Sequence, residues 1–116
     1  MNKPLEIEVT YQGNIARVKL RGRLDTPGVD RVEAKFTSAV VPEARNTVVD
    51  LSEVPFIASM GLRMFIGLAK QLKRSNAKIV LFAPQSQVND VFITVAMREI
   101  MPIVIDEAEA MRFAAS

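Results

Sequence analysis

The pattern of apolar and polar positions near the N-terminus predicts a β-hairpin. Residues 5–11 and residues 16–21 both alternate apolar with polar side chains, which is the period of a half-buried strand. The short segment 12–14 between them contains a glycine and is typical of a tight turn. The first strand is acidic and the second is basic, so we expect opposite charges to pair across the hairpin.

After the hairpin, short apolar segments alternate with segments of helical periodicity. Residues 47–51, 78–83 and 103–105 are short and mostly apolar, and the first of them predicts a central strand covered on both faces. Each of these strands is followed by a predicted helix. The pattern therefore predicts an α/β fold in the order ββαβαβαβα, with a mostly parallel sheet and right-handed crossovers after the N-terminal hairpin.

The first two helices are predicted from their starts and their apolar stripes. Asp25 or Thr26 can cap the first helix, with Pro27 in its first turn, and the stripe ends near residues 41–42. The second helix covers residues 62–72 and is followed by basic residues, which suit the negative end of its dipole. Its core stripe is expected to contain Leu62, Phe65, Ala69 and Leu72.

The last two helices are shorter. Ser86 is expected to cap the third helix. The apolar stripe of this helix is predicted to contain Val88, Val91, Phe92 and Val95. Residues 106–109 have an acidic capping pattern and predict a final helix that runs through Met111.

The amino-acid composition excludes several kinds of chemistry. The 116 residues, 49% hydrophobic and 24% charged, predict one domain over residues 1–116. The chain has no cysteine and no histidine, which removes disulfides, thiolate chemistry, the commonest general base and the usual transition-metal ligand. There is also no glycine-rich nucleotide loop. We therefore expect a protein that is not an enzyme and has no metal or cofactor.

The charge and hydropathy of the chain argue against several classes of partner. The net charge is only +2, the signs are interleaved and no basic stripe is present, so nucleic-acid binding is not expected. No run approaches the roughly 20 apolar residues that span a membrane. The first six residues lack the apolar core of a secretory signal. These features predict a small cytoplasmic domain without a membrane partner.

The candidate functional residue is Ser59, which lies where an apolar strand meets an amphipathic helix. A serine there can cap the helix with its side-chain oxygen. The same free N–H groups and positive dipole end would also stabilise a phosphate. Arg23 and Arg63 are candidate counter-charges, and Gly61 leaves the backbone uncrowded beside the serine.

The helix after Ser59 has a second face with helical spacing, distinct from its core stripe. The residues of this face are Met60, Met64, Gly67 and Gln71. Methionine at such spacing often fills a core, but the core stripe of this helix is complete without it. Arg63 lies beside the face, whose composition suits a partner-binding surface.

Three segments resemble the STAS domain, and more narrowly the stand-alone anti-sigma-factor antagonists of bacteria. These segments are Gly22-Arg23-Leu24-Asp25, Val49-Asp50-Leu51-Ser52-Glu53-Val54-Pro55-Phe56-Ile57-Ala58-Ser59-Met60-Gly61-Leu62 and Ala77-Lys78-Ile79-Val80-Leu81. The likeness covers essentially the whole chain, including the strand–helix order. It implies a small superhelix of strand–helix units that begins with a hairpin.

The resemblance also implies a function. Members of this family bind an anti-sigma factor that is a serine kinase of the histidine-kinase-like ATPase type, and phosphorylation of one serine in an Asp-Ser-Ser-Gly motif breaks the complex. By position, Ser59 matches that serine, and Asp25 matches an aspartate at the end of the second strand that faces the partner. Gly61 matches the motif glycine, and Gly67 matches a glycine on the partner-facing helix.

The motif differs from the family pattern on both sides of Ser59, where Ala58 replaces the aspartate and Met60 replaces the second serine. Three functions follow as alternatives: a phosphorylation switch, a constitutive STAS scaffold or transporter-accessory module, and a small-molecule or nucleotide sensor. A monomer and a homodimer are both left open. The expected partner-binding residues around Ser59 are Arg23, Asp25, Ala58, Met60, Gly61, Arg63, Met64 and Gly67.

Overall fold

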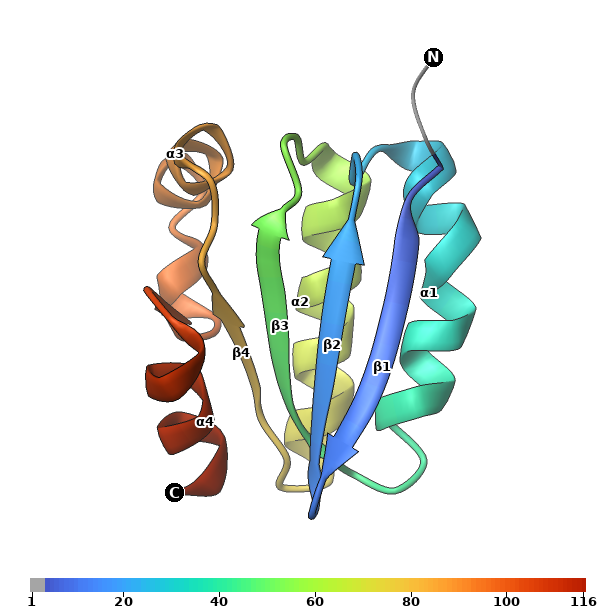
Figure 1. Ribbon diagram of the computed structural model, residues 1–116, viewed down its shortest axis with the longest axis vertical. Helices are drawn as coiled ribbons and strands as arrows, with labels where there is room; N and C mark the ends of the chain where they lie inside the picture. The colour runs from blue at the N-terminus through green and yellow to red at the C-terminus, as the bar shows by residue number, and fades with distance from the viewer. Residues whose placement is uncertain (1–3) are drawn as a thin grey trace.

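Five strands form one mixed sheet in a computed structural model, which describes residues 4–116 (Figure 1). The strands are β1 (Glu6–Gln12), β2 (Ile15–Arg21), β3 (Asn46–Glu53), β4 (Ile79–Phe82) and β5 (Ile103–Val104). They lie in the order β1-β2-β3-β4-β5; the first pair is antiparallel and the others are parallel. The predicted fold class, the element order and the N-terminal hairpin are confirmed.

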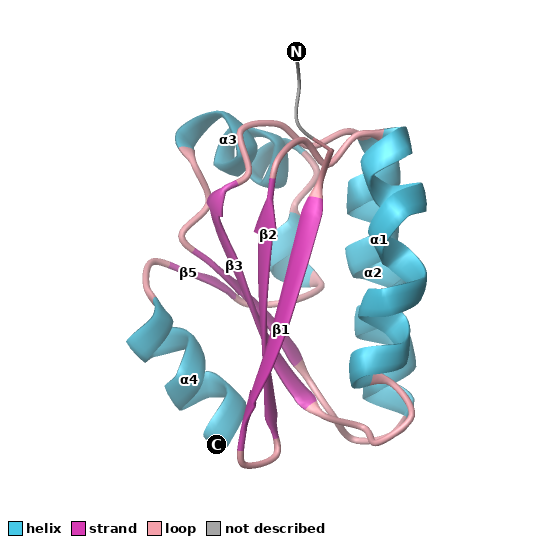
Figure 2. Cartoon of the chain, turned by 45° about the vertical axis from the view of Figure 1, so that its right-hand side comes forward, coloured by secondary structure: helices cyan, strands magenta, loops and turns pink. Residues whose placement is uncertain are grey.

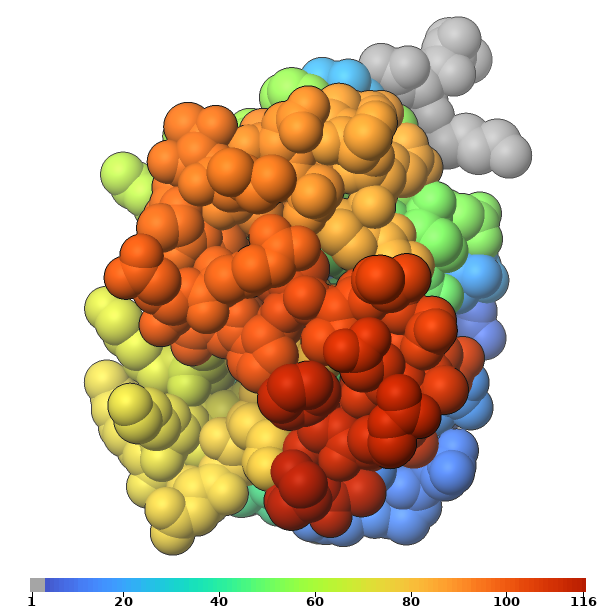
Figure 3. Space-filling model, turned by 90° about the vertical axis from the view of Figure 1, so that its left-hand side faces the viewer, coloured from blue at the N-terminus to red at the C-terminus, as the bar shows by residue number. Residues whose placement is uncertain are grey.

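Helices cover both faces of this sheet. They are α1 (Thr26–Val40), α2 (Ser59–Arg74), α3 (Ser86–Thr94), the 3₁₀ helix η1 (Met97–Glu99) and α4 (Glu107–Ala115). The helices α1 and α2 lie together on one face, whereas α4 lies on the other face against β3 and β4 (Figure 2). The orange and red segments that include α3 and α4 make up much of one side of the surface, where they lie beside the yellow segment at the end of α2 (Figure 3).

The two covered faces of the sheet hold two separate groups of buried side chains. The larger group lies under α1 and α2, where the rings of Phe36 and Phe65 meet edge to face with centroids 6.4 Å apart. The smaller group lies under α4 and contains Val48, Phe82 and Ala110. Since Val48 and Val49 of β3 belong to different groups, this strand is buried on both faces, as its continuous apolar run predicts.

Two of the predicted helix starts are confirmed. The carboxylate of Asp25 accepts a hydrogen bond from the amide of Gly28 at 2.9 Å, and the carboxylate of Asp106 accepts one from Glu109 at 2.9 Å. These side chains satisfy amides that would otherwise lack a partner in the first turns of α1 and α4.

Several predicted boundaries are wrong. Gln85, and not Ser86, occupies the cap position of α3, and it makes no side-chain capping bond. Val95 follows the end of α3 and is 45% exposed, so it does not belong to the core stripe. The final helix extends to Ala115 because its buried residues include Ala114, and η1 was not predicted.

Two further expectations concern membranes and secretion. Within residues 4–116, no helix is both long enough and apolar enough to cross a membrane. Half of the N-terminal segment 1–6, which lacks the apolar core of a secretory signal, lies outside the described residues.

Candidate partner-binding site

The β2–α1 loop and the β3–α2 loop lie side by side at the carboxyl ends of their strands. The amide of Gly22 donates to the carbonyl of Glu53 at 3.0 Å, and the amide of Leu24 donates to Phe56 at 2.9 Å. The amide of Ala58 then donates back to the carbonyl of Leu24 at 2.9 Å. These bonds continue the parallel pairing of β2 and β3 beyond the strands, so the two loops form one rigid edge.

Asp25 organises the first of these loops. One carboxylate oxygen caps α1, and the other lies 3.5 Å from Nε of Arg23. The guanidinium group of Arg23 in turn lies over the ring of Phe56, 4.1 Å from its centroid. This cation–π contact joins the side chains of the two loops. Phe56 is 38% exposed and Arg23 is also partly exposed, so the pair forms an accessible platform.

Phe56 is a residue of this site that sequence reasoning missed. It lies inside the segment that resembles the family, but its aromatic ring was assigned no role. Its exposure follows from the backbone, because Phe56 lies in the loop after β3 while its neighbour Ile57 points into the core at 4% exposure. Aromatic and arginine side chains are frequent among the residues that contribute most of the binding energy at protein interfaces.

Ser59 is the first residue of α2 and is exposed. The prediction that it caps the helix is wrong: Ala58 occupies the cap position, in extended backbone with φ −103° and ψ 175°. The carbonyl of Ala58 accepts bonds from Gly61 and Leu62, which begins the helix without any side-chain cap. The first turn of α2 contains no acidic residue, so nothing there repels an anion.

Two expected surface residues of α2 are buried instead. Met64 is 2% exposed and packs in the larger core, so the prediction that it contributes to an outward face is wrong. Gly61 is also buried; a β-carbon there would lie 2.8 Å from Cγ1 of Ile57 and 3.1 Å from the carbonyl oxygen of Leu24. This glycine therefore allows α2 to pack closely against the paired loops.

The other predicted residues of α2 are accessible to different degrees. Arg63 is exposed, whereas Met60 and Gly67 are half-buried. A β-carbon on Gly67 would meet no atom within 4 Å, so this glycine borders open space. The structure thus leaves Met60, Arg63 and Gly67 beside Ser59 as the part of the predicted face that a partner can reach.

Two glutamines hold the β3–α2 loop from its other side. Nε2 of Gln85 donates to the carbonyl of Ser52 at 2.9 Å, and Nε2 of Gln87 donates to Pro55 at 3.0 Å. Both side chains come from the start of α3, which lies beside this loop. The segment that carries Phe56 is therefore fixed by bonds from the β2–α1 loop and from the start of α3, which sequence reasoning did not anticipate.

A cleft adjoins the platform on the side of α1. It has a volume of about 630 Å³ and is bordered by residues from both the N-terminal segment and the start of α1, including Leu5, Arg23, Asp25 and Arg31. Acidic and basic side chains are balanced there. The cleft enlarges the concave surface beside Arg23 without adding an uncompensated charge.

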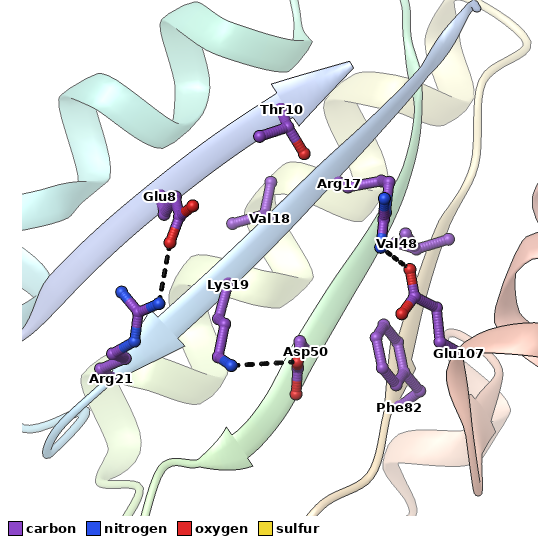
Figure 4. A pocket seen from close by; sticks show the side chains of 10 residues that line it. All are labelled: Glu8, Thr10, Arg17, Val18, Lys19, Arg21, Val48, Asp50, Phe82 and Glu107. Carbon is purple, nitrogen blue, oxygen red and sulfur yellow. Dashed lines mark hydrogen bonds and ion pairs between the residues drawn. The ribbon is translucent and has the colours of Figure 1, made fainter. Parts of the chain in front are cut away.

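A second, smaller cleft lies on the sheet face beside α4, away from Ser59. Figure 4 shows that charged side chains from β1, β2, β3 and α4 converge on it, and its volume is about 380 Å³. Its cations are paired: Arg17 contacts Glu107, and Arg21 lies 2.8 Å from Glu8.

The third cation of this cleft, Lys19, lies 2.9 Å from the carboxylate of Glu53 and 3.9 Å from that of Asp50. The contact with Lys19 lowers the pKa of Glu53, and the contact with Glu53 raises the pKa of Lys19. Because its basic groups are neutralised, this cleft does not present a free cationic site. No group of three or more acidic residues that could hold a metal occurs in the described part of the chain.

Comparison with known proteins identifies the family. The sequence matches the STAS domain over residues 6–110, and the chain belongs to this family. It is 26% identical over 99 residues to an anti-sigma-B factor antagonist of Staphylococcus aureus, a match that covers 85% of this chain and 92% of the relative. It is also 30% identical over 84 residues to BtrV of Bordetella bronchiseptica, described as a candidate anti-sigma factor antagonist, with 72% of each chain covered.

Solved structures show the same fold. An anti-sigma factor antagonist from Mycobacterium paratuberculosis superposes with a TM-score of 0.84 at 19% identity, covering 100% of both chains. The antagonist SpoIIAA in its unphosphorylated form gives a TM-score of 0.74 at 20% identity, covering 91% of this chain and 93% of its own. Bacillus SpoIIAA in a phosphorylated form gives 0.66 at 20% identity, covering 92% of this chain and 97% of that one.

Proposed function

We propose that this protein is an anti-sigma-factor antagonist that binds its partner through the surface around Ser59. Relatives that match most of this chain carry that description, and the fold agrees with it. The single observation that supports the site is the exposed hydroxyl of Ser59 at the start of α2, beside the rigid paired loops. We call the surface the Ser59 surface; it consists of Arg23, Asp25, Phe56, Ser59, Met60, Arg63 and Gly67.

The partner is an anti-sigma factor that is also a serine kinase, and the complex forms in the cytoplasm. A kinase needs an accessible hydroxyl that is held in a defined position. Ser59 meets both needs, because it is exposed and its backbone follows directly from Ala58, which is bonded to the neighbouring loop. The half-exposed Phe56 ring, with the arginine stacked on it, supplies the apolar anchor of the interface.

Phosphorylation of Ser59 ends the interaction. A phosphoserine carries close to two negative charges and three acceptor oxygens. In the free protein, the open N-terminus of α2 stabilises this dianion, since the amides of the first turn point toward it. Burying the same group unpaired in an interface would cost several kcal/mol, which corresponds to a loss of affinity on the order of a thousandfold.

The replacement of the usual aspartate by Ala58 alters the charge around the phosphate. The first turn of α2 has no carboxylate, and Arg63 lies one turn after Ser59 on the same helix. The phosphorylated form should therefore be more stable than the unmodified form, rather than strained by repulsion.

The test uses the anti-sigma kinase recovered with the native chain. Incubation with ATP should add one phosphate to the wild type and none to Ser59→Ala, as measured by intact mass. Ser86→Ala is the matched control, because Ser86 is also an exposed serine at the first position of a helix. Ser59→Asp should bind the unmodified kinase far more weakly than Ser59→Ala.

The alternative is a constitutive scaffold or transporter-accessory module. Ala58 and Met60, which break the family's serine motif, are the observations that favour it. A wild-type chain that gains no phosphate, and whose Ser59→Asp variant binds the partner as tightly, would replace the switch with this alternative. Phosphate on another residue would reject Ser59 as the acceptor while leaving the antagonist function intact.

A further inference from the structure

The outward face of α2 carries a stripe of cations that begins beside Ser59. The helix has four basic residues and no acidic one. All four are exposed, and they are Arg63, Lys70, Lys73 and Arg74. At about 3.6 residues per turn, the side chains of Arg63, Lys70 and Arg74 project within about 40° of one another, on the same side of the helix as Ser59. We call the four residues the α2 cationic stripe; it extends about 16 Å along the helix axis.

No ion pair neutralises this stripe within residues 4–116. The ion pairs in that part of the chain use cations of β2 or of the loops at either end of α1, namely Arg17, Lys19, Arg21, Arg23 and Arg45. The basic groups of α2 are therefore segregated from those that the chain pairs with its own carboxylates. Their charge is available to a group outside the chain.

The stability of the helix accounts for only part of the stripe. Lys73 and Arg74 lie in the last turn of α2, where the helix dipole favours a cation. Arg63 and Lys70 lie outside that turn, so the dipole gives them no such advantage. Lys70 also has Lys73 and Arg74 at positions i+3 and i+4, where like charges destabilise a helix. A charge pattern that the helix itself does not favour needs another cause.

The Ser59 surface continues into the stripe. Arg63 belongs to both, and Gly67, which borders open space, lies between Arg63 and Lys70 in the helix. The residues of the Ser59 surface are far fewer than the roughly 20–30 residues that each side of a standard interface contributes. A partner that sits on Ser59 therefore also covers α2. It needs carboxylates opposite the stripe, because a charge enclosed in an interface without a counter-charge is unfavourable.

Two other anionic ligands fit the stripe less well. Most of the large apolar side chains of α2 are buried in the core, namely Met64, Phe65, Leu68 and Leu72. This leaves few large apolar residues on the outward face for insertion into a membrane surface. The stripe also has no aromatic ring that could stack on a nucleic-acid base, because Phe65 is the only aromatic residue of α2.

We propose that the α2 cationic stripe docks on an acidic surface of the same anti-sigma kinase that binds the Ser59 surface. The inference rests on the proposed function and adds the chemistry of the partner. Opposite charges attract two proteins before they touch, so the stripe acts mainly on the association rate. A phosphate on Ser59 brings close to two negative charges to the same side of the helix, which also slows association of the modified chain.

Stopped-flow association of the unphosphorylated full-length chain with the recovered kinase tests the stripe. At low ionic strength, the double variant Lys70→Glu/Arg74→Glu should associate at least about tenfold more slowly than the wild type. The difference should shrink as salt is added, because salt screens exposed charges. The variant Lys70→Gln/Arg74→Gln, which removes the charges without reversing them, should lie between the two. The dissociation rate should change less than the association rate.

Arg112→Glu is the matched control for Arg74→Glu. Both residues are exposed cations in the last turn of a helix, but Arg112 belongs to α4 on the other face of the sheet (Figure 2). Arg74→Glu should slow association about threefold, and Arg112→Glu less than about twofold. An equal effect of both would show that the net charge of the chain governs association, which would overturn the proposal. Urea unfolding of each variant checks that the fold is retained.

The same measurements separate this inference from the proposed function. Unchanged association of the Lys70→Glu/Arg74→Glu variant would overturn the stripe, while weaker binding of Ser59→Asp than of Ser59→Ala would still support the switch. Slower association of the double variant, together with equal binding of the two Ser59 variants, would support the stripe and reject the switch. If only the wild type bound RNA or phosphatidylglycerol vesicles, and kinase association were unchanged, the stripe would belong to that ligand and the proposal would be overturned.

Discussion

The amide of Ala58 donates to the carbonyl of Leu24 at 2.9 Å, so the residue that starts α2 is bonded to the loop before α1. The carbonyl of Ala58 accepts the first bonds of α2 at the same time. This arrangement positions Ser59 through backbone contacts alone. It explains why a helix can start beside a serine whose side chain is not used as a cap, and why that side chain is left free for modification.

The two glycines of α2 should respond in opposite ways to the same substitution. Gly61→Ala places a β-carbon within 2.8 Å of Ile57, which forces the helix away from the paired loops and should lower the free energy of unfolding by about 1–3 kcal/mol. Gly67→Ala enters open space within a helix and should raise it by about 0.5–1 kcal/mol. Urea unfolding of both variants measures these two changes. A change in the free energy of unfolding that has the same sign in both variants would contradict this packing role of Gly61.

Asp25 should contribute to stability mainly through its cap. Asp25→Ala removes the oxygen that accepts the amide of Gly28, so the free energy of unfolding should fall by about 1 kcal/mol. Asp25→Asn keeps an acceptor at this position and should be close to the wild type, although it loses the contact with Arg23. Thermal unfolding of the two variants distinguishes the contribution of the cap from that of the ion pair. An equal loss of stability in both variants would mean that the negative charge of Asp25 contributes more than its capping bond.

Phe56 should contribute to partner binding more than to folding. Its ring is 38% exposed, so Phe56→Ala should weaken binding of the unphosphorylated chain to the anti-sigma kinase by about 1–2 kcal/mol. Phe113→Ala is the matched control, because Phe113 is 43% exposed on α4, far from the Ser59 surface (Figure 1). Titration calorimetry compares them, and an equal loss of affinity in the control would show that the effect is not specific to the site.

The Lys19–Glu53 ion pair predicts a defined pH dependence. Since the pKa of Glu53 is lowered in the folded protein, its stabilising contribution is present above the ordinary pKa of glutamate and is lost as the pH falls through the lowered value. Since the pKa of Lys19 is raised, its contribution is lost as the pH rises through the raised value. The wild type should therefore exceed Glu53→Gln in stability between about pH 5 and pH 10, with convergence outside this window.

Unfolding curves of the wild type, Glu53→Gln, Lys19→Gln and the double variant across this pH range provide the measurement. Each single variant should lose the contribution of the Lys19–Glu53 pair, and the double variant should lose less than the sum of the two single losses, because this pair is absent from all three variants. A Glu53→Gln profile parallel to that of the wild type at every pH would contradict the pairing.

The strand–helix order was predictable because each element has its own local signal. Alternation defines the hairpin, continuous apolar runs define β3 and β4, and Asp25 and Asp106 mark two helix starts. Charge pairing across the hairpin was also correct, with Arg21 bonded to Glu8, although these residues are diagonal rather than directly opposite. The segments that resemble the family indicated where Ser59 lies in this order of elements.

The orientation of α2 about its own axis was not predictable from its sequence. Apolar residues surround more than half of this helix, so more than one stripe has helical spacing. The helix packs against both the sheet and α1, and this buries Met64 while leaving Leu62 and Ala69 only half-buried. A choice between such stripes depends on neighbouring elements that are distant in sequence.

The sequence by itself determined the fold class, the succession of elements and the position of Ser59 between β3 and α2, because short-range periodicity and turn chemistry encode them. Only the tertiary structure decided that Ala58 rather than Ser59 occupies the cap position of α2, that Gly61 is a packing residue and that Phe56 stands exposed under Arg23. These features depend on the pairing of two loops about 30 residues apart, and the hydrogen bonds between them involve backbone groups that every residue carries.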